Sequence, residues 1–279
     1  MSIVTFINNG KEQTGKTLSA AAIATYMAIE HNCKILLVST SNDGSTLSNC
    51  FFPKPKTIIQ IKNKYTGKNN VGIDTMQTGM NGLIKMARAN KITPETIKNY
   101  TKVVFKDAFE ILLSGNEMGN DISSYYPDII KMANQYYDYV FVDLDEDIDI
   151  PTKRIIINES NLIVYNITQR LLSIDNFIQE KARSQLLSSF KTILLVGRHD
   201  RFSKYTAKNI SRYMGDKVPV LTIPYNTLYF EAAEEAGVPD FFINSRRKDK
   251  EDRNYGFMQE VGRVAQAIIF RLQELQIKS

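Results

Sequence analysis

The sequence predicts an α/β protein with a doubly wound, mainly parallel β-sheet flanked by helices. Short apolar runs of strand length alternate with longer segments of helical periodicity along most of the 279 residues. The strand-like runs are apolar at nearly every position, which is typical of strands that helices cover on both faces. Neither an internal repeat nor a linker divides the chain, so we expect a single domain that spans residues 1–279.

The predicted strands are short and rich in Val, Ile, Leu and Phe. They cover residues 4–7, 34–38, 109–113, 139–144, 162–167, 192–196 and 218–223. The first strand runs into Asn8, Asn9 and Gly10, which are turn-forming residues. The chain is therefore expected to begin with a buried strand followed directly by a turn.

The helical segments have apolar residues at helical spacing or are rich in small residues. They are predicted at residues 16–30, 80–87, 94–100, 122–135, 173–188, 204–214 and 255–276. The last of them has a regular apolar stripe, which we expect to pack on the sheet. Residues 53–72 are rich in Lys, Asn, Gly and Pro, and this composition predicts a loop excursion from the core.

Composition narrows the class of protein. A hydrophobic content of 43% and a charged content of 23% are ordinary for a soluble globular chain. The two cysteines, Cys33 and Cys50, lie in neither a CxxC motif nor a Cys/His cluster, so we expect no structural zinc and no disulfide framework. The natural compartment for such a chain is the reducing cytoplasm.

The sequence predicts neither a membrane span nor a signal peptide. No apolar run approaches the roughly 18 residues of a membrane span, and the N-terminus lacks the basic region of a signal peptide. We therefore expect no integral membrane association. The net charge of +5 permits contact with nucleic acid or an anionic surface, although such a mild excess is more often ordinary surface charge.

Residues 10–17, the phosphate loop, carry the strongest functional signal. Gly10, Gly15, Lys16 and Thr17 satisfy the pattern Gly-x₄-Gly-Lys-Thr between a predicted strand and a predicted helix. In this motif the backbone N–H groups wrap phosphates, the lysine reaches the terminal phosphates, and the threonine hydroxyl binds Mg²⁺. The sequence therefore predicts binding of ATP with Mg²⁺. The predicted nucleotide contacts here are Gly10, Lys11, Glu12, Gln13, Thr14, Gly15, Lys16, Thr17 and Leu18.

Lys11 is an additional lysine that an ordinary phosphate loop does not need. It directly follows the first glycine, so it cannot easily turn back onto phosphates held by its own loop. It could instead reach a nucleotide in a facing subunit. This position therefore favours a dimer with two nucleotides enclosed at its interface.

With both lysines, the loop resembles that of the ParA/MinD family of deviant Walker-A ATPases. The family pattern Lys-Gly-Gly-x-Gly-Lys-Thr aligns with residues 11–17. The resemblance implies dimerisation on ATP, with Lys11 crossing to the phosphates of the partner subunit. Glu12 and Gln13 replace two family glycines, so this chain needs backbone angles that a side chain tolerates and has a carboxylate beside the nucleotide.

The strand at residues 139–144 resembles the second nucleotide motif of this family, an apolar strand that ends in Asp. Asp143 is the predicted Mg²⁺ ligand, together with Thr17. The following residues are Leu144, Asp145, Glu146 and Asp147, where relatives have a neutral turn. Asp145 or Glu146 is one alternative for activating the attacking water.

The segment after the second strand departs most from the family. Relatives have Asp-x-Asp there, whereas this chain has Ser39 and Ser41, with Asp43 two residues later. Serine cannot accept a proton near neutral pH as a carboxylate can. We expect Lys11, Lys16 and Asp43 to be the catalytic residues, hydrolysis to be slow, and the nucleotide to act as a dimerisation switch.

The resemblance extends to the predicted base side of the nucleotide. Pro224 and Tyr225 follow the last predicted strand and match the family's adenine-side turn, and residues 230–237 resemble the helix that follows it. Arg198 occupies a strand end where many relatives have Asn, and it is predicted to stack on the base. An ordinary surface arginine is the alternative interpretation of Arg198.

The cargo is not fixed by these residues. The basic run at residues 245–250 could contact DNA phosphates, as in partition ATPases, or form a solvated loop. Residues 72–74, 91–95 and 110–115 resemble a TadZ/CpaE-like branch that localises pilus assembly machinery.

Three functions follow in order of preference. The first is a ParA/MinD-like ATPase that dimerises on ATP and positions plasmid DNA, chromosomal DNA or a protein assembly. The second is a TadZ-like nucleotide-binding scaffold, with an adaptor or cargo protein and little catalysis. The third, ranked last, is an enzyme that transfers phosphate to a small metabolite.

Overall fold

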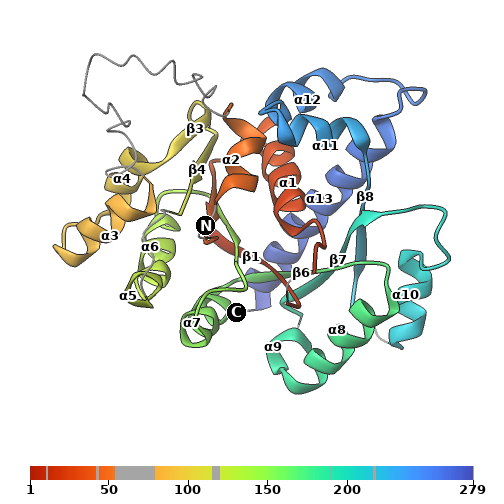
Figure 1. Ribbon diagram of the computed structural model, residues 1–279, viewed down its shortest axis with the longest axis horizontal. Helices are drawn as coiled ribbons and strands as arrows, with labels where there is room; N and C mark the ends of the chain where they lie inside the picture. Colours follow the sequence, from red (N-terminus) through yellow and green to blue (C-terminus); the bar gives the residue numbers. More distant parts are fainter. Residues whose placement is uncertain are drawn as a thin grey trace, which may run out of the picture.

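In the computed structural model, eight strands of the described residues form one sheet. The structure describes residues 1–10, 12–41, 44–53, 79–114, 120–188, 190–215 and 218–278. The strand order is β3-β4-β2-β5-β1-β6-β7-β8, and every neighbouring pair is parallel except β3 with β4 (Figure 1). The predicted doubly wound, mainly parallel α/β fold is therefore confirmed.

The central strands are buried along their whole length, because helices cover both faces of the sheet. The strands are β1 Ser2–Asn8, β2 Ile35–Ser39, β3 Lys102–Phe105, β4 Phe109–Leu112, β5 Tyr139–Asp143, β6 Leu162–Ile167, β7 Thr192–His199 and β8 Val220–Pro224. Every predicted strand is present, with ends that differ by a few residues. The antiparallel edge strand β3 was not predicted, because its side chains are only partly buried and its apolar run is short.

One face of the sheet is covered by helices from the two ends of the chain. These helices are α1 Lys16–Glu30, α2 Ser45–Phe51, α11 Thr227–Glu234, α12 Val238–Ser245 and α13 Tyr255–Lys278. The alanines of α1 are fully buried, and α13 lies close enough that a Cβ at Gly262 would be 2.5 Å from the Tyr26 hydroxyl oxygen. The small residues thus let α1 pack between the sheet and α13.

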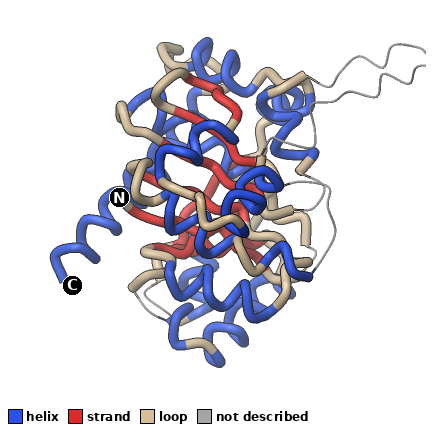
Figure 2. Tube along the Cα trace, turned by 90° about the vertical axis from the view of Figure 1, so that its left-hand side faces the viewer, coloured by secondary structure: helices blue, strands red, loops and turns tan. Residues whose placement is uncertain are grey.

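Helices from the middle of the chain cover the opposite face. Figure 2 shows the strands enclosed by helices. The helices of this face are α3 Met80–Arg88, α4 Pro94–Ile97, α5 Asn120–Ser123, α6 Tyr126–Ala133, α7 Ile150–Glu159, α8 Leu171–Arg183, α9 Gln185–Ser188 and α10 Ala207–Met214, with a 3₁₀ turn at Lys98–Tyr100. The predicted helix at 122–135 is divided between α5 and α6. Pro127 lies in the first turn of α6, where its missing N–H is tolerated.

Three helices were not predicted, namely α2, α7 and α12. Each is short, and α7 has a weak apolar face with only Thr152 and Ile156 buried. The predicted excursion at 53–72 lies outside the described residues from position 54 onward. None of the described helices is both long and apolar enough to span a bilayer.

Candidate nucleotide site

The phosphate loop joins the end of β1 to the start of α1. Gly10 and Gly15 have φ angles of +58° and +76°, a left-handed conformation that glycine adopts without strain. The Asn8 side-chain amide donates hydrogen bonds to the carbonyls of Gly10 at 2.9 Å and Glu12 at 3.1 Å. These bonds close the loop at its base and leave the N-terminus of α1 directed at the enclosed space.

The loop also rests against the end of β7. A Cβ at Gly197 would lie 2.1 Å from the carbonyl oxygen of Thr14, so only glycine fits at position 197. Arg198 covers the other side, since a Cβ at Gly15 would be 3.0 Å from the Arg198 Cγ. The sequence reasoning missed the role of Gly197, because it depends on a contact with Thr14 from a distant part of the chain. It also missed Asn8, whose contacts are local but depend on how the loop folds back.

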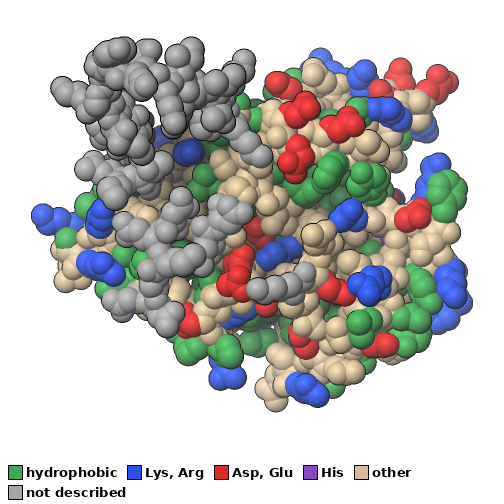
Figure 3. Space-filling view, in the orientation of Figure 1, with side chains coloured by type: hydrophobic (Ala, Val, Ile, Leu, Met, Phe, Trp, Pro, Cys, Tyr) green, Lys and Arg blue, Asp and Glu red, His purple; other side chains and the backbone are tan. Residues whose placement is uncertain are grey.

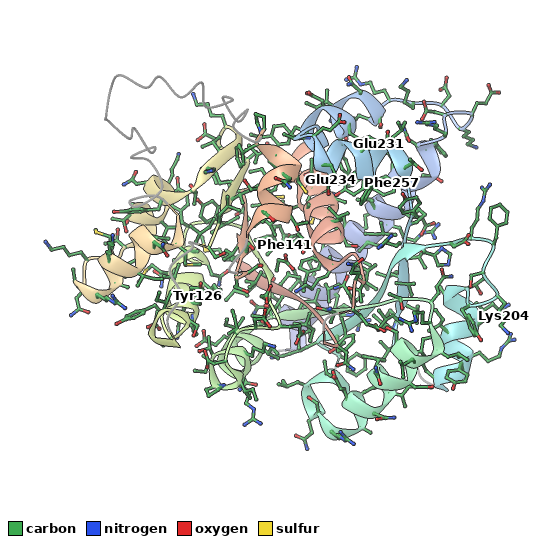
Figure 4. The ribbon with its side chains drawn as sticks, in the orientation of Figure 1. Tyr126, Phe141, Lys204, Glu231, Glu234 and Phe257 are labelled. Atoms are coloured by element: carbon green, nitrogen blue, oxygen red, sulfur yellow. The ribbon has the colours of Figure 1, made fainter. Side chains whose placement is uncertain are left out.

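Lys16, Thr17 and Asp143 meet at the base of the loop. The Thr17 hydroxyl donates to Asp143 Oδ2 at 2.7 Å, and Lys16 Nζ lies 3.2 Å from Asp143 Oδ1. Lys16 also donates to the Leu144 carbonyl. β1 pairs with β5 in parallel, with Phe6 beside Asp143, so both strand ends reach the same edge of the sheet (Figure 4 labels Phe141 on β5).

This arrangement fits a magnesium ion. Asp143 is 3% exposed, and its Oδ1 accepts no hydrogen bond from any described residue, although Lys16 is its ion-pair partner. A hydroxyl and a carboxylate are the oxygen ligands that Mg²⁺ prefers. The described residues contain no cluster of three or more His, Cys, Asp or Glu for a metal, so waters and phosphates would complete the coordination.

A cavity of about 280 Å³ lies above these three side chains. The ends of β2 and β5 line its other side, with Ser39, Ser41, Asp145 and Glu146 among the lining residues. Figure 3 shows acidic and basic side chains together near the middle of the face drawn. A loop of N–H donors, a lysine and a Mg²⁺-type ligand pair around one cavity can hold a nucleoside polyphosphate.

No family model matches the chain, and a search of curated proteins found no match. Solved structures do match. A ParA family ATPase from Chlorobium tepidum has a TM-score of 0.66 at 15% identity, covering 95% of this chain and 98% of that one.

Two further solved structures share this fold. MinD from Pyrococcus horikoshii, complexed with Mg-ADP, has a TM-score of 0.63 at 16% identity and covers 97% of this chain and 98% of its own. A Borrelia burgdorferi plasmid partition protein bound to AMPPNP has a TM-score of 0.60 at 15% identity, with 99% and 98% covered. The fold is that of the ParA and MinD ATPases. At these identities the comparison shows the shared fold alone.

Within the ParA/MinD fold, Glu12 is the most conspicuous change in the loop. The carboxylate accepts a hydrogen bond from the Ser173 hydroxyl of α8 at 2.6 Å, and that hydroxyl accepts one from the Thr168 N–H at 3.1 Å. Glu12 is thereby held toward α8. Gln13 is exposed.

The end of β2 has no carboxylate among its described residues. Ser39 Oγ accepts a hydrogen bond from the Ser41 N–H at 3.3 Å, and Ser114 donates to the Ser41 carbonyl. Both serines line the cavity, at the place where the resemblance leads one to expect aspartates. Asp43 and Lys11, two of the predicted catalytic residues, lie outside the described residues.

The predicted base-side residues gather next to the loop. Leu18, Arg198, Pro224 and Tyr225 line one small pocket, and the Arg198 guanidinium lies 5.9 Å from the centre of the Tyr225 ring. Arg198 has a φ of +52°, and its side chain lies against Gly15. Its predicted contact with the base stays a prediction.

A buried tyrosine, Tyr229, which the sequence did not single out, lines the small pocket next to the loop. The Tyr229 hydroxyl donates to the Leu18 carbonyl at 2.7 Å, and its ring packs 4.8 Å from that of Phe257 on α13. Burial raises the pKa of Tyr229 well above its ordinary value, so the hydroxyl remains a donor. Phe257, Glu231 and Glu234 mark this region between α11 and α13 in Figure 4.

Proposed function

We propose that this chain binds ATP with Mg²⁺, dimerises around the bound nucleotides and acts as a slow positioning or segregation ATPase. The observation that carries the proposal is the contact of Lys16 and Thr17 with Asp143 beneath a closed phosphate loop. The neighbours with this fold include one complexed with Mg-ADP and one bound to AMPPNP. The buried free thiols of Cys33 and Cys50 are compatible with a reducing cytoplasm, where we expect the protein to act.

Dimerisation rests on the early lysine and on the surface beside the loop. Lys11 is the residue proposed to cross to the partner's nucleotide. Leu171 and Leu172 are 41% and 58% exposed, and they directly precede Ser173, which contacts Glu12 of the loop. An exposed apolar pair next to the loop offers a contact surface for a second copy.

Sedimentation velocity with and without ATP·Mg²⁺ tests this proposal. The parent chain is expected to change from monomer to dimer on ATP, and Lys11→Ala is expected to remain monomeric. Lys106→Ala is the matched control, since Lys106 is an exposed lysine in the turn between β3 and β4, at the opposite edge of the sheet. A dimer that forms equally well without nucleotide would contradict the sandwich.

For a DNA cargo, the structure favours a different surface from the predicted basic run. Within residues 245–250, Arg246 forms an ion pair with Glu30 at 2.6 Å and Lys248 with Asp252 at 3.5 Å. Residues 201–212 instead carry cations that form no ion pair with any described residue, and aromatic rings accompany two of them (Figure 4 labels Lys204). The cations are Arg201, Lys204, Lys208 and Arg212.

A salt titration of DNA binding, with and without ATP, separates DNA from protein cargo. Phosphate contacts make affinity fall steeply with salt, and charge removal lowers the slope. For a partition function we expect affinity that requires ATP and is weakened by Arg201→Ala with Lys204→Ala. The matched pair Arg247→Ala with Lys250→Ala tests the original basic run.

The alternative is a TadZ-like scaffold that binds nucleotide without useful catalysis. The observation that favours it is the pair of serines, Ser39 and Ser41, on the cavity where carboxylates are expected. Phosphate release measured with saturating DNA or partner protein distinguishes the two functions. Sustained turnover excludes the scaffold, whereas nucleotide binding without turnover supports it.

A further inference from the structure

The carboxylates around the phosphate cavity differ in the hydrogen-bond and ion-pair partners that they already have. Glu146 forms an ion pair with Lys153 at 2.9 Å, and the same ammonium donates to the Glu146 carbonyl at 2.6 Å. Glu12 accepts the hydrogen bond of Ser173 at 2.6 Å. Both carboxylates are therefore oriented by neighbours on α7 and α8 and are poorly placed to serve a water at the terminal phosphate.

Two more carboxylates come from the end of β5. Asp143 is held by Lys16 and Thr17 and is the proposed Mg²⁺ ligand. Asp145 is half-buried on the cavity wall, and its Oδ1 accepts a hydrogen bond from the Asp147 N–H at 2.8 Å. Its second oxygen accepts no hydrogen bond from the described residues, so it can accept one from a bound water.

Asp145 is also held in place by the strand that lacks carboxylates. The Thr40 hydroxyl accepts a hydrogen bond from the Asp145 N–H at 2.8 Å and donates to the Asp143 carbonyl at 3.1 Å. Thr40 is 1% exposed and lies between Ser39 and Ser41. The ends of β2 and β5 are thus joined by one buried hydroxyl, which fixes the backbone of Asp145 beside the two serines.

We propose that Asp145 supplies the carboxylate that orients and deprotonates the attacking water, in place of the carboxylates that Ser39 and Ser41 lack. The inference rests on the proposed ATPase function and adds the residue that carries out its hydrolysis. The water oxygen forms a bond to the γ-phosphorus, while the bond from that phosphorus to the β–γ bridging oxygen breaks and its electron pair leaves with ADP. One water proton moves to Asp145 and then to solvent, so the products are ADP, phosphate and a proton.

Asp145→Asn tests this assignment, with single-turnover release of phosphate and ATP affinity measured on the same preparation. A positioned general base contributes roughly 100-fold or more, so we expect phosphate release to fall by about 100-fold. We expect the ATP affinity and the melting temperature to stay close to those of the parent chain, because the isosteric amide can keep the bond from Asp147. A merely structural role would lower all three.

Asp249→Asn is the matched control, an exposed carboxylate in the loop between α12 and α13, away from the cavity. It is expected to leave both release and affinity unchanged. Asp43→Asn tests the competing carboxylate. Release by Asp145→Asn at the parent rate, or a loss seen with Asp43→Asn alone, would overturn the assignment.

The inference and the proposed function fail differently. A parent chain that binds ATP·Mg²⁺ but releases no phosphate under any condition overturns the role of Asp145 and leaves nucleotide binding intact. A parent chain that binds no ATP overturns the proposed function itself.

Discussion

The ends of β1 and β2 carry different chemistry, although both face the same cavity. After β1, a loop closed by Asn8 brings Lys16 and Thr17 into contact with Asp143. These three side chains are the proposed ligands of the phosphates and Mg²⁺. At the end of β2, the described side chains on the cavity include the neutral hydroxyls of Ser39 and Ser41 and no carboxylate. The comparison teaches that the contacts proposed to bind phosphate and Mg²⁺ come from the ends of β1 and β5 and need no carboxylate at the end of β2.

Gly197→Ala is expected to have the largest effect, because it displaces the phosphate loop at the end of β1. The added Cβ would lie 2.1 Å from the Thr14 carbonyl, so the loop must move. We expect at least a tenfold loss of ATP affinity and a destabilisation of about 1–3 kcal/mol from overpacking. Isothermal titration and thermal melting measure the two effects.

Gly256→Ala is the control for that substitution, since a Cβ there would meet nothing within 4 Å and Gly256 lies in α13. Alanine is the better helix former, so this variant should keep its ATP affinity and its stability. Equal losses in both variants would show that Gly197 does not support the loop specifically.

Glu12→Gln sharpens the comparison, because Glu12 brings a negative charge to the binding side. The amide can still accept the hydrogen bond from Ser173, while the repulsion of the phosphates is removed. A charge interaction of about 1 kcal/mol corresponds to roughly a fivefold gain in ATP affinity, and the gain should shrink at high salt. Glu95→Gln, an exposed carboxylate on α4, should change nothing. Weaker binding by Glu12→Gln would mean that the carboxylate assists the nucleotide.

The smallest expected effect concerns pH and the end of β7. Burial lowers the pKa of His199 below its ordinary value of 6.5, against the opposing fields of Glu260 and Asp200. The unfolded chain therefore binds the proton more readily, and stability should fall as pH drops from about 6.5 through the lowered pKa. Urea unfolding of the parent and His199→Gln at pH 7 and pH 5 measures this. The variant should lose less stability on acidification, and an equal loss would exclude His199 as the cause.

The sequence predicted the layers of the fold because its apolar runs are long and regular. It missed α2, α7 and the edge strand β3, whose patterns are short or half-exposed. The phosphate loop was recognisable because its residues are adjacent in sequence. The contacts of Ser173, Gly197, Tyr229 and Thr40 with the site were not predictable, since each joins segments between 100 and more than 200 positions apart, as in Tyr229 with Leu18.

The sequence also located the change at β2 without showing what replaces it. Ser39 and Ser41 stand out in a linear comparison, which left Asp43 and the pair Asp145 and Glu146 as alternative carboxylates. Only the fold brings the end of β5 to the same place and shows Thr40 bonded to the backbone at both Asp143 and Asp145. The sequence could not choose between these carboxylates, because the choice depends on contacts between strands.

Titration of ATP into the parent chain, with and without Mg²⁺, tests the central claim most directly. The geometry of Lys16, Thr17 and Asp143 predicts saturable binding of one ATP per chain that weakens sharply when Mg²⁺ is withheld, and that is lost in Lys16→Ala. Binding that is absent, or that is equally strong without Mg²⁺ and in Lys16→Ala, would contradict the account.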